Sequence, residues 1–486
     1  RCVDEGVACI MSAYNRVNGE YCGHNGRLLR EILKKEWGFT GFVMSDFVFG
    51  VRNGVRAALG GLDVEMPYRW RYGYGFKRKV KRGMVPVETI DEAARRVIRT
   101  KAAFARAGEG DYDPAHVGSE RHAELALAVA RESIVMLKNR GKTLPLDRST
   151  LSRLAVIGPL ADRENIGDMG SSRVKPPYVV TPLAGIKKLA AGEIEIVHDS
   201  GSDPGRAGAL AREADASVVV VGLTRKDEGE YMPVIHTGGD RLDLRLPRGQ
   251  AELVSAVASE GGPCVVVLEG GSAIVTEPWI NEVDSLLMAW YPGMEGGNAI
   301  AGVLFGEVNP SGKLPLTFPA SNDQNPSFDR KARRQEYGYY HGYRLFNERG
   351  MKPSFAFGFG LTYTVFEYSA LHLDQVVVMP GGGLTVDAVV SNTGDVAGTE
   401  TAQLYVGYGS SRTDRPVREL KGFTRVTLPA GESAGVRFRV EARDLARYDP
   451  GTASWIVDPG EYYVYVGSSS REEDLVLRAR FTVAAG

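Results

Sequence analysis

The segment Gly41-Phe42-Val43-Met44-Ser45-Asp46 combines a short apolar run with a carboxylate at its end. It follows residues 25–37, whose apolar side chains recur at helical spacing, so Phe42-Val43-Met44 is predicted to be a buried strand. This order places Asp46 at the carboxyl end of a strand, where barrel enzymes carry their reactive groups. A strand-end Asp alone more often caps a helix or forms a turn, so a catalytic role for Asp46 has to be judged from the flanking sequence.

Two flanking segments supply further strand ends: Ile10-Met11-Ser12-Ala13-Tyr14-Asn15-Arg16-Val17-Asn18-Gly19 before Asp46, and Gly61-Leu62-Asp63-Val64-Glu65-Met66-Pro67 after it. Together with the Asp46 segment they resemble the catalytic (β/α)8 barrel of glycoside hydrolase family 3, the β-glucosidase and β-xylosidase family. The resemblance implies that Asp46, the Asp of the family's (V/M)SD motif, is the catalytic nucleophile.

The same resemblance implies the sugar-binding positions. Tyr14 matches the Tyr of the family's SYN motif, and Met11 falls where the family lines the sugar pocket. Phe47 stands where the family usually has Trp after the nucleophile, and Ala13 replaces the Ser of SYN. We therefore expect Tyr14, Met11 and Phe47 to contact substrate, with altered leaving-group contacts.

Composition restricts the class of protein. A chain of 486 residues predicts two to four domains. Lys plus Arg (59) nearly balance Asp plus Glu (60), which argues against a nucleic-acid or anionic-membrane partner, and no apolar run is long enough to span a membrane. The four cysteines are expected to be free thiols, with a disulfide from Cys2 or Cys9 to Cys22 as the less favoured alternative. No metal-ligand spacing is present, and the compartment stays open between cytoplasm, periplasm and secretion.

The predicted domains follow from changes in the sequence pattern. Only three strand-like segments precede residue 117, whereas a closed barrel needs eight and about 250 residues. Residues 1–117 are therefore predicted to be the C-terminal part of a (β/α)8 barrel, closed by a helix capped at Thr89, and the sequence looks like the C-terminal part of a larger protein. Residues 118–325 begin with a helix predicted from Ser119 to about Asn139 and continue with Val-rich strands alternating with helices. This alternation predicts an α/β sandwich with a mostly parallel sheet.

The C-terminal third changes period. Residues 326–370, rich in Tyr, Phe and Gly, are predicted to be an ordered connector. Residues 371–486 show short strands with period two, typical of a β-sandwich that resembles the family's fibronectin-III-like tail. The resemblance to the family's sandwich domain rests on segments spread over three regions: Ser133–Asn139, Trp290–Pro319 and Phe357–Tyr363.

Hydrolysis with retention needs a second carboxyl group about 5 to 5.5 Å from the nucleophile. In the family it comes from a mobile loop of the second domain, in a Glu-Gly motif ahead of Gly-Asp-Arg. Glu228-Gly229 and Gly239-Asp240-Arg241 match that pattern, so Glu228 is the first candidate for the acid/base and Glu230 the alternative. Without the resemblance these acids would be interpreted as a solvated loop beside Arg225 and Lys226.

The sequence thus predicts a retaining exo-acting β-glucosidase that needs no metal or cofactor and acts on β-glucosides or cello-oligosaccharides. A β-xylosidase or mixed-specificity glycosidase is the alternative within the same class, and a noncatalytic carbohydrate-binding or scaffold protein is the alternative from another class. A homodimer remains open. The Gly270-Gly271-Ser272 segment matches no phosphate-binding motif and is interpreted as a tight turn.

Overall fold

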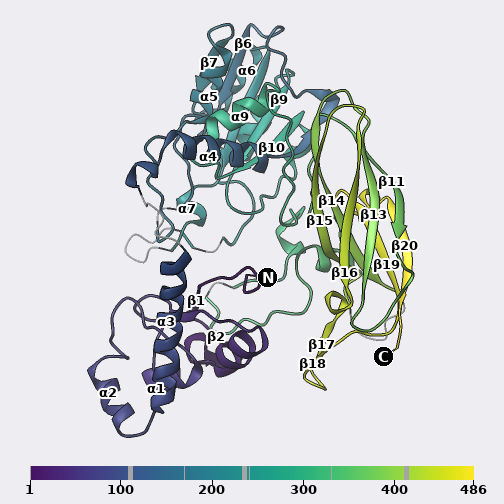
Figure 1. The fold of residues 1–486 in the computed structure, drawn as a ribbon. Helices are drawn as coiled ribbons and strands as arrows, with labels where there is room; N and C mark the ends of the chain where they lie inside the picture. The colour runs from purple at the N-terminus through teal and green to yellow at the C-terminus, as the bar shows by residue number, and fades with distance from the viewer. Residues whose placement is uncertain are drawn as a thin grey trace. The chain divides into compact units, whose positions relative to one another are not determined.

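The computed structural model describes residues 2–107, 113–168, 170–231, 238–239, 241–329, 331–409 and 415–485 (Figure 1). The chain divides into two compact units, residues 1–114 and 115–486, and each is described by itself.

Unit 1 is built around two parallel strands. β1 (Cys9–Ser12) pairs with β4 (Phe42–Ser45), with Met11 opposite Met44. The third predicted strand is reduced to a parallel bridge between Met44 and Val64. Further elements of unit 1 are β2 (Arg16–Val17), β3 (Glu20–Tyr21), the 3-10 helix Cys22–His24, the helix Arg27–Glu36, α1 (Gly54–Gly60), α2 (Tyr74–Lys81) and α3 (Val87–Ala107).

Two helix predictions in unit 1 are wrong in detail. The helix Arg27–Glu36 is wound as a π-helix, and the Trp37 N–H reaches back five residues to Ile32 O. This winding differs from the α-helical spacing assumed from the sequence, and Trp37, predicted on the apolar face, is 56% exposed. α3 begins at Val87, directly after Pro86 and two residues before the predicted cap Thr89.

A buried ion pair supports β4. The Lys34 ammonium lies 2.8 Å from the Asp63 carboxylate, and both side chains are at most 5% exposed. The second Asp63 oxygen accepts the Val43 N–H at 2.7 Å. Asp63 therefore holds a structural position.

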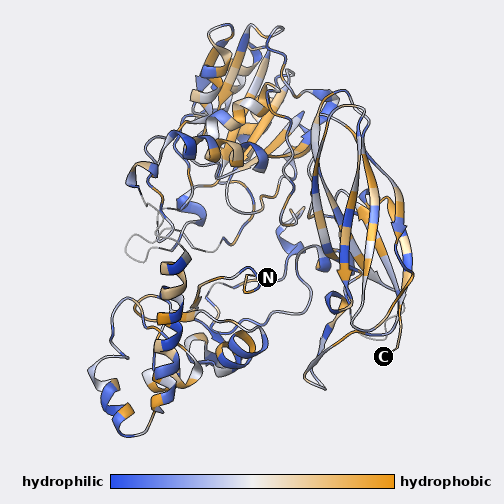
Figure 2. Ribbon diagram, in the orientation of Figure 1, coloured by the Kyte–Doolittle hydropathy of each residue, from blue (hydrophilic) through white to orange (hydrophobic). Residues whose placement is uncertain are grey.

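Unit 2 contains a six-stranded sheet of order β5-β10-β9-β8-β6-β7, in which only β5 is antiparallel to its neighbour. Helices cover both faces, and the apolar strands are buried on both sides (Figure 2). α4, α5 and α9 pack on one face, and α6 and α8 pack on the other. The bounds are α4 (Glu120–Ser133), β5 (Val135–Asn139), β6 (Arg153–Ile157), α5 (Pro182–Ala190), β7 (Glu195–Asp199), α6 (Pro204–Arg212), β8 (Ala216–Gly222), α7 (Arg225–Glu228), α8 (Gln250–Ala258), β9 (Cys264–Glu269), β10 (Ser285–Trp290) and α9 (Gly296–Leu304).

The helix predicted from Ser119 to Asn139 is wrong over its last six residues, 134–139. α4 ends at Ser133, and Val135–Asn139 forms the edge strand β5, paired with β10. Ile134, Val135, Met136 and Leu137 are at most 2% exposed. Burial in the sheet therefore outweighs the helical pattern that precedes them.

The C-terminal part of unit 2 is a β-sandwich of a three-stranded sheet (β11-β13-β16) and a five-stranded sheet (β12-β20-β19-β14-β15). Its strands alternate buried and more exposed residues around one core. The bounds are α10 (Gly342–Glu348), which precedes it, and β11 (Phe366–Leu373), β12 (Val377–Val378), β13 (Gly383–Asn392), β14 (Gly398–Tyr408), β15 (Arg418–Leu428), β16 (Ser433–Glu441), β17 (Arg447–Asp449), β18 (Ser454–Ile456), β19 (Gly460–Gly467) and β20 (Leu477–Val483).

Three further observations concern the described residues alone. All four cysteines are free, which agrees with the first of the two alternatives predicted. None of the helices placed by the structure combines the length and apolarity that crossing a membrane requires. No cluster of His, Cys, Asp or Glu is arranged to hold a metal ion.

Asp63→Ala is expected to destabilise unit 1 by about 3–5 kcal/mol, because the Lys34 ammonium would stay buried without its partner. Native-state hydrogen exchange of residues 42–46 in urea measures this change. The control is Glu31→Ala, which removes the partner of the exposed Arg27 and should change stability by less than about 1 kcal/mol. Equal effects of the two variants would contradict the structural role of Asp63.

Candidate active site

Asp46 follows β4 directly and is fixed through its backbone. Its N–H donates to Ser12 O at 3.1 Å, and its Oδ1 accepts the Phe47 N–H at 2.7 Å. The chain then folds back tightly, since a Cβ on Gly50 would lie 2.5 Å from Asp46 O. The side chain of Asp46 is partly exposed, so the carboxylate is held in place and open to a ligand.

The three predicted sugar-binding residues lie around this strand end. The Tyr14 hydroxyl donates to Phe47 O at 2.7 Å, which connects the loop after β1 to the residue after Asp46. Met11, Tyr14 and Phe47 are 52%, 44% and 49% exposed. Unit 1 thus presents an exposed aromatic and thioether surface beside the Asp46 carboxylate.

Glu228 lies in unit 2 at the end of α7, which follows β8. Thr224 and Asp227 form a capping box that starts this single turn. The Glu228 carboxylate accepts hydrogen bonds from the Gly271 N–H, the Ser272 hydroxyl and, at 2.8 Å, the Tyr291 hydroxyl. It is therefore anchored to the ends of β9 and β10.

The sequence missed these partners of Glu228. Gly270-Gly271-Ser272 is a turn, as predicted, but its backbone and hydroxyl also bind the candidate acid. Burial and the nearby Glu228 carboxylate raise the pKa of the Tyr291 hydroxyl, so Tyr291 remains a proton donor to Glu228 at neutral pH. The Val-rich strands were the signal that could have identified these partners, because neighbouring parallel strands end at the same edge of the sheet and bring the residues that follow them together.

Arg241 completes the surroundings of Glu228. Its guanidinium donates to Ser272 Oγ and Ala273 O, both at 2.9 Å. Burial lowers the pKa of Arg241, and the Glu228 and Asp227 carboxylates oppose that shift. Glu228, Tyr291 and Arg241 line one cavity of unit 2. Asp240 of the predicted Gly239-Asp240-Arg241 motif lies outside the described residues.

Glu230 has a different environment. It is exposed, and its carboxylate accepts the Ser171 N–H at 2.5 Å and the Ser171 hydroxyl at 3.1 Å. Its own N–H donates to Asp168 at 2.9 Å. The loop that carries Asp168 and Ser171 therefore binds Glu230, while the strand ends bind Glu228.

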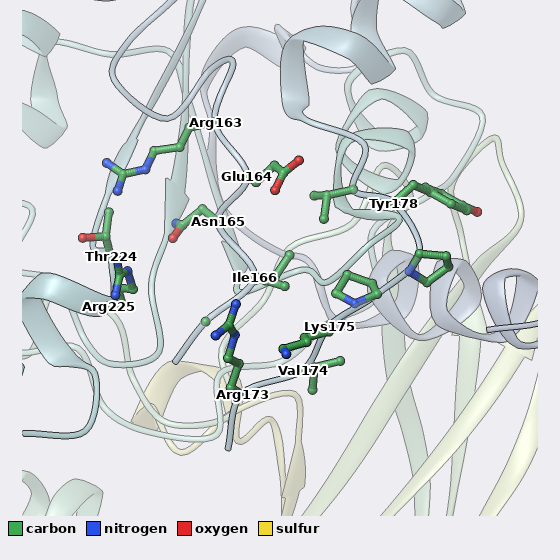
Figure 3. A pocket seen from close by; sticks show the side chains of 14 residues that line it. Arg163, Glu164, Asn165, Ile166, Arg173, Val174, Lys175, Tyr178, Thr224 and Arg225 are labelled. Atoms are coloured by element: carbon green, nitrogen blue, oxygen red, sulfur yellow. The ribbon is translucent and has the colours of Figure 1, made fainter. Parts of the chain in front are cut away.

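A second hollow of unit 2 begins where α7 begins (Figure 3). Arg163, Arg173, Lys175 and Arg225 contribute side chains to it, and none of these cations pairs with a carboxylate in the described parts of the chain. All four are exposed, so solvent screens their charges. With Glu164 as the acid in its lining, the hollow carries more cations than carboxylates.

Glu269 is a buried acid at the end of the strand next to β8, which precedes α7. It ends β9, is 1% exposed and accepts the Asn165 amide at 2.8 Å. Burial raises the pKa of Glu269 to about 8, and Asn165 and Arg163 offset only part of that rise. Glu269 is therefore predominantly neutral at pH 7.

Replacing Glu269 by Gln is expected to stabilise the protein progressively as pH rises from about 4.5 to 8. In that window the folded protein keeps the Glu269 proton and the unfolded chain releases it, so raising the pH favours unfolding of the wild type. Thermal or urea unfolding should show the difference growing by up to about 1.4 kcal/mol per pH unit and levelling off above pH 8. A difference that does not depend on pH would contradict the assignment.

Comparison with known proteins covers most of the chain. Residues 1–100 match the glycosyl hydrolase family 3 N-terminal domain, residues 134–363 the family 3 C-terminal domain, and residues 400–470 a fibronectin type III-like domain. These matches confirm the predicted family resemblance and the fold class, with its α/β part followed by an all-β domain.

Individual relatives agree with these domain matches. Thermostable β-glucosidase B of Acetivibrio thermocellus is 38% identical over 96% of this chain, which spans 62% of that relative. A β-xylosidase of Formosa agariphila is 34% identical over 97% of the chain and 69% of its own length. The crystal structure of the β-D-glucoside glucohydrolase of Trichoderma reesei is similar with a TM-score of 0.91, at 29% identity, over 99% of this chain and 73% of that one. The chain belongs to glycoside hydrolase family 3.

Proposed function

We propose that this chain supplies the reacting carboxyl groups of a retaining β-glucosidase that releases terminal nonreducing β-D-glucosyl residues. The observation that carries the proposal is the partly exposed Asp46 carboxylate, fixed at the strand end and flanked by the exposed side chains of Met11, Tyr14 and Phe47. An aromatic surface beside a fixed carboxylate suits a sugar ring, whose C–H groups pack on aromatic faces while its anomeric carbon meets the nucleophile.

The proposed reaction has two displacements. Asp46 attacks the anomeric carbon as the glycosidic C–O bond breaks, and the acid/base transfers its proton to the departing oxygen. The glycosyl–enzyme ester is then hydrolysed by a water molecule, whose proton returns to the same acid/base. Hydrolysis of the ester restores the Asp46 carboxylate and releases the sugar with its anomeric configuration retained.

Two glutamates compete for the acid/base role. The motif match ranks Glu228 first. The resting contacts favour Glu230, because, among the described residues, the Glu228 carboxylate accepts three hydrogen bonds from its own domain whereas the exposed Glu230 carboxylate accepts two, both from Ser171. A proton donor has to leave its resting contacts to reach the glycosidic oxygen, and Glu230 has fewer to break. Glu228 would then anchor the loop.

β-Xylosidase activity is the alternative, supported by the relative from Formosa agariphila that is named a β-xylosidase. Xylosides lack the hydroxymethyl group of glucosides, so the ratio of kcat/KM for paired aryl β-glucoside and β-xyloside substrates separates the two activities.

Asp46→Asn is expected to lower kcat for aryl β-glucoside hydrolysis by about 10⁴-fold or more, because an amide cannot form the ester intermediate. Release of nitrophenol by the intact protein measures the loss. Asp395→Asn, a change at an exposed turn, is the matched control and should leave kcat unchanged. Full activity of Asp46→Asn would contradict the assignment of the nucleophile, whereas no activity in the wild-type protein would support the noncatalytic carbohydrate-binding alternative.

Azide is expected to restore turnover of an activated aryl glucoside in Glu230→Ala, since this small nucleophile replaces the water that the missing base would activate. Glu228→Ala should lose activity without rescue, because it would detach the loop from Gly271 and Tyr291. The β-glucosyl azide product is measured by chromatography. Rescue of Glu228→Ala alone would reverse this assignment in favour of the ranking from the sequence.

A further inference from the structure

His24 lies in unit 1, in the 3-10 helix Cys22–His24 that follows β3, and its side chain is 2% exposed. Its Nε2 atom lies 3.1 Å from the backbone N of Arg52 and 3.2 Å from the backbone N of Asn53. A backbone N–H can only donate, so Nε2 is the acceptor in both hydrogen bonds. Nε2 therefore carries no proton, and the proton of the neutral ring is on Nδ1.

These two hydrogen bonds hold the end of the loop that begins after Asp46. Asn53 is the N-cap of α1, and its side chain accepts the N–H groups of Val55 and Arg56. The backbone N–H of Asn53 is bound by His24, so this one residue joins the loop both to the helix that follows it and to the buried ring. Residues 47–53 are thus fixed at both ends, by β4 and by His24.

The loop that His24 holds also orients the Asp46 carboxylate. Its first residue, Phe47, donates its N–H to Asp46 Oδ1 at 2.7 Å. Farther along, a Cβ on Gly50 would lie 2.5 Å from Asp46 O, and a Cβ on Gly23 would lie 3.0 Å from Gly50 O. Backbone therefore packs on backbone from residue 23 through residue 50 to residue 46. The strand fixes the Asp46 backbone, and the loop fixes its carboxylate.

Protonation of His24 would break both of its hydrogen bonds to the loop. A second ring proton has to bind to Nε2, which faces two N–H groups, and a protonated Nε2 can only donate. The charged ring would then be buried with its new N–H directed at two other donors, which is unfavourable. Either the loop moves away or the ring moves into water. Neutral His24 thus holds the loop, and charged His24 does not.

The titratable and charged side chains that the structure places around His24 are Glu20, Tyr21, Arg52 and Arg56. Glu20 Oε1 lies 3.6 Å from His24 Nδ1, and Glu20 also pairs with Arg56. The Tyr21 and His24 rings pack edge to face, with centroids 5.7 Å apart. Burial lowers the pKa of His24; the Glu20 carboxylate opposes this shift, and the Arg56 and Arg52 guanidinium groups add to it. The neutral ring is therefore favoured at pH 7.

We propose that His24 is a positioning residue for Asp46: its unprotonated Nε2 holds the loop of residues 47–53, and protonation of His24 releases this loop. The catalytic role rests on the function proposed above for Asp46, whereas the behaviour of the loop does not. In the open loop His24 binds a proton with the ordinary pKa of about 6.5, and in the closed loop it resists protonation. The closed loop is therefore stable at neutral pH and becomes less stable as the pH falls below about 6.5.

Hydrogen–deuterium exchange of the intact protein, corrected for the intrinsic pH dependence of exchange, tests the release of the loop. Protection of residues 47–53 should fall by up to about tenfold between pH 7.5 and 5.5, a range in which carboxyl groups of ordinary pKa stay ionised. In His24→Gln the amide oxygen can still accept the two N–H groups but does not titrate, so this fall should disappear. His372→Gln is the matched control, since His372 is exposed on β11, and it should keep the wild-type pH dependence.

A fall in loop protection that persists in His24→Gln, or that is absent from the wild type, would overturn the proposal. Imidazole ¹⁵N NMR of the wild type is a second measurement that does not depend on the folding of a variant. His24 Nε2 should be unprotonated at pH 7 and should gain its proton at lower pH than the exposed His372 does. A proton on Nε2 at pH 7 would also overturn the proposal.

The pH profile of kcat for an aryl β-glucoside tests the positioning of Asp46. Between pH 7 and 5.5, kcat of the wild type should fall more steeply than kcat of His24→Gln. Parallel profiles in the two proteins, together with pH-dependent loop protection, would overturn the positioning role and leave His24 a structural residue. Absence of turnover in the wild type would contradict the function proposed above, and exchange and NMR would still decide the loop because neither needs turnover.

Discussion

The parallel pairing of β8 with β9, which sets Gly222 opposite Glu269, is the constraint on which the Glu228 site depends. A Cβ on Gly222 would lie 1.9 Å from Glu269 O, so only glycine allows the two strand ends to approach this closely. Glu228 follows six residues after Gly222, and Gly271 follows two residues after Glu269. Trp290 pairs with Glu269 on the other side, which brings Tyr291 to the same edge. Three strand ends thus supply one carboxylate and its donors.

Parallel strand pairing also positions Asp46 in unit 1, but without a separate helical turn. β1 and β4 are also parallel, and the Asp46 N–H is bound by Ser12 O from the neighbouring strand. Asp46 leaves the strand without an intervening helical turn, so its position follows directly from the strand. Glu228 stands on a separate turn and depends on side-chain contacts for its position. The proposed nucleophile is therefore rigid by construction, whereas the proposed acid/base loop can be released by breaking a few hydrogen bonds.

The sequence pattern predicted those elements whose structure depends on residues close together in the chain. The Val-rich runs gave the parallel sheet, and the apolar run before Asp46 gave its strand, because burial on both faces requires such sequences. The end of α4 was missed because Val135–Asn139 becomes a strand only through its pairing with β10, about 150 residues away. Gly271 and Tyr291 were missed for a similar reason, since they lie 43 and 63 residues from Glu228. No short motif records such contacts, which arise from the order of strands in the sheet.

The neutral state of Glu269 explains how one edge of the sheet tolerates several acids. The charges of Asp227, of Glu228 and, when it is ionised, of Glu269 all raise the pKa of Tyr291, so they act on the same place. An ionised Glu269, buried and bound among the described side chains by Asn165, would add a further negative charge near the Glu228 carboxylate and would repel it. Desolvation prevents this by keeping the proton on Glu269 up to about pH 8. The Gly271 N–H and the Tyr291 hydroxyl therefore bind the Glu228 carboxylate without a competing negative charge on Glu269. The hydrogen bonds that anchor the loop should weaken when Glu269 ionises.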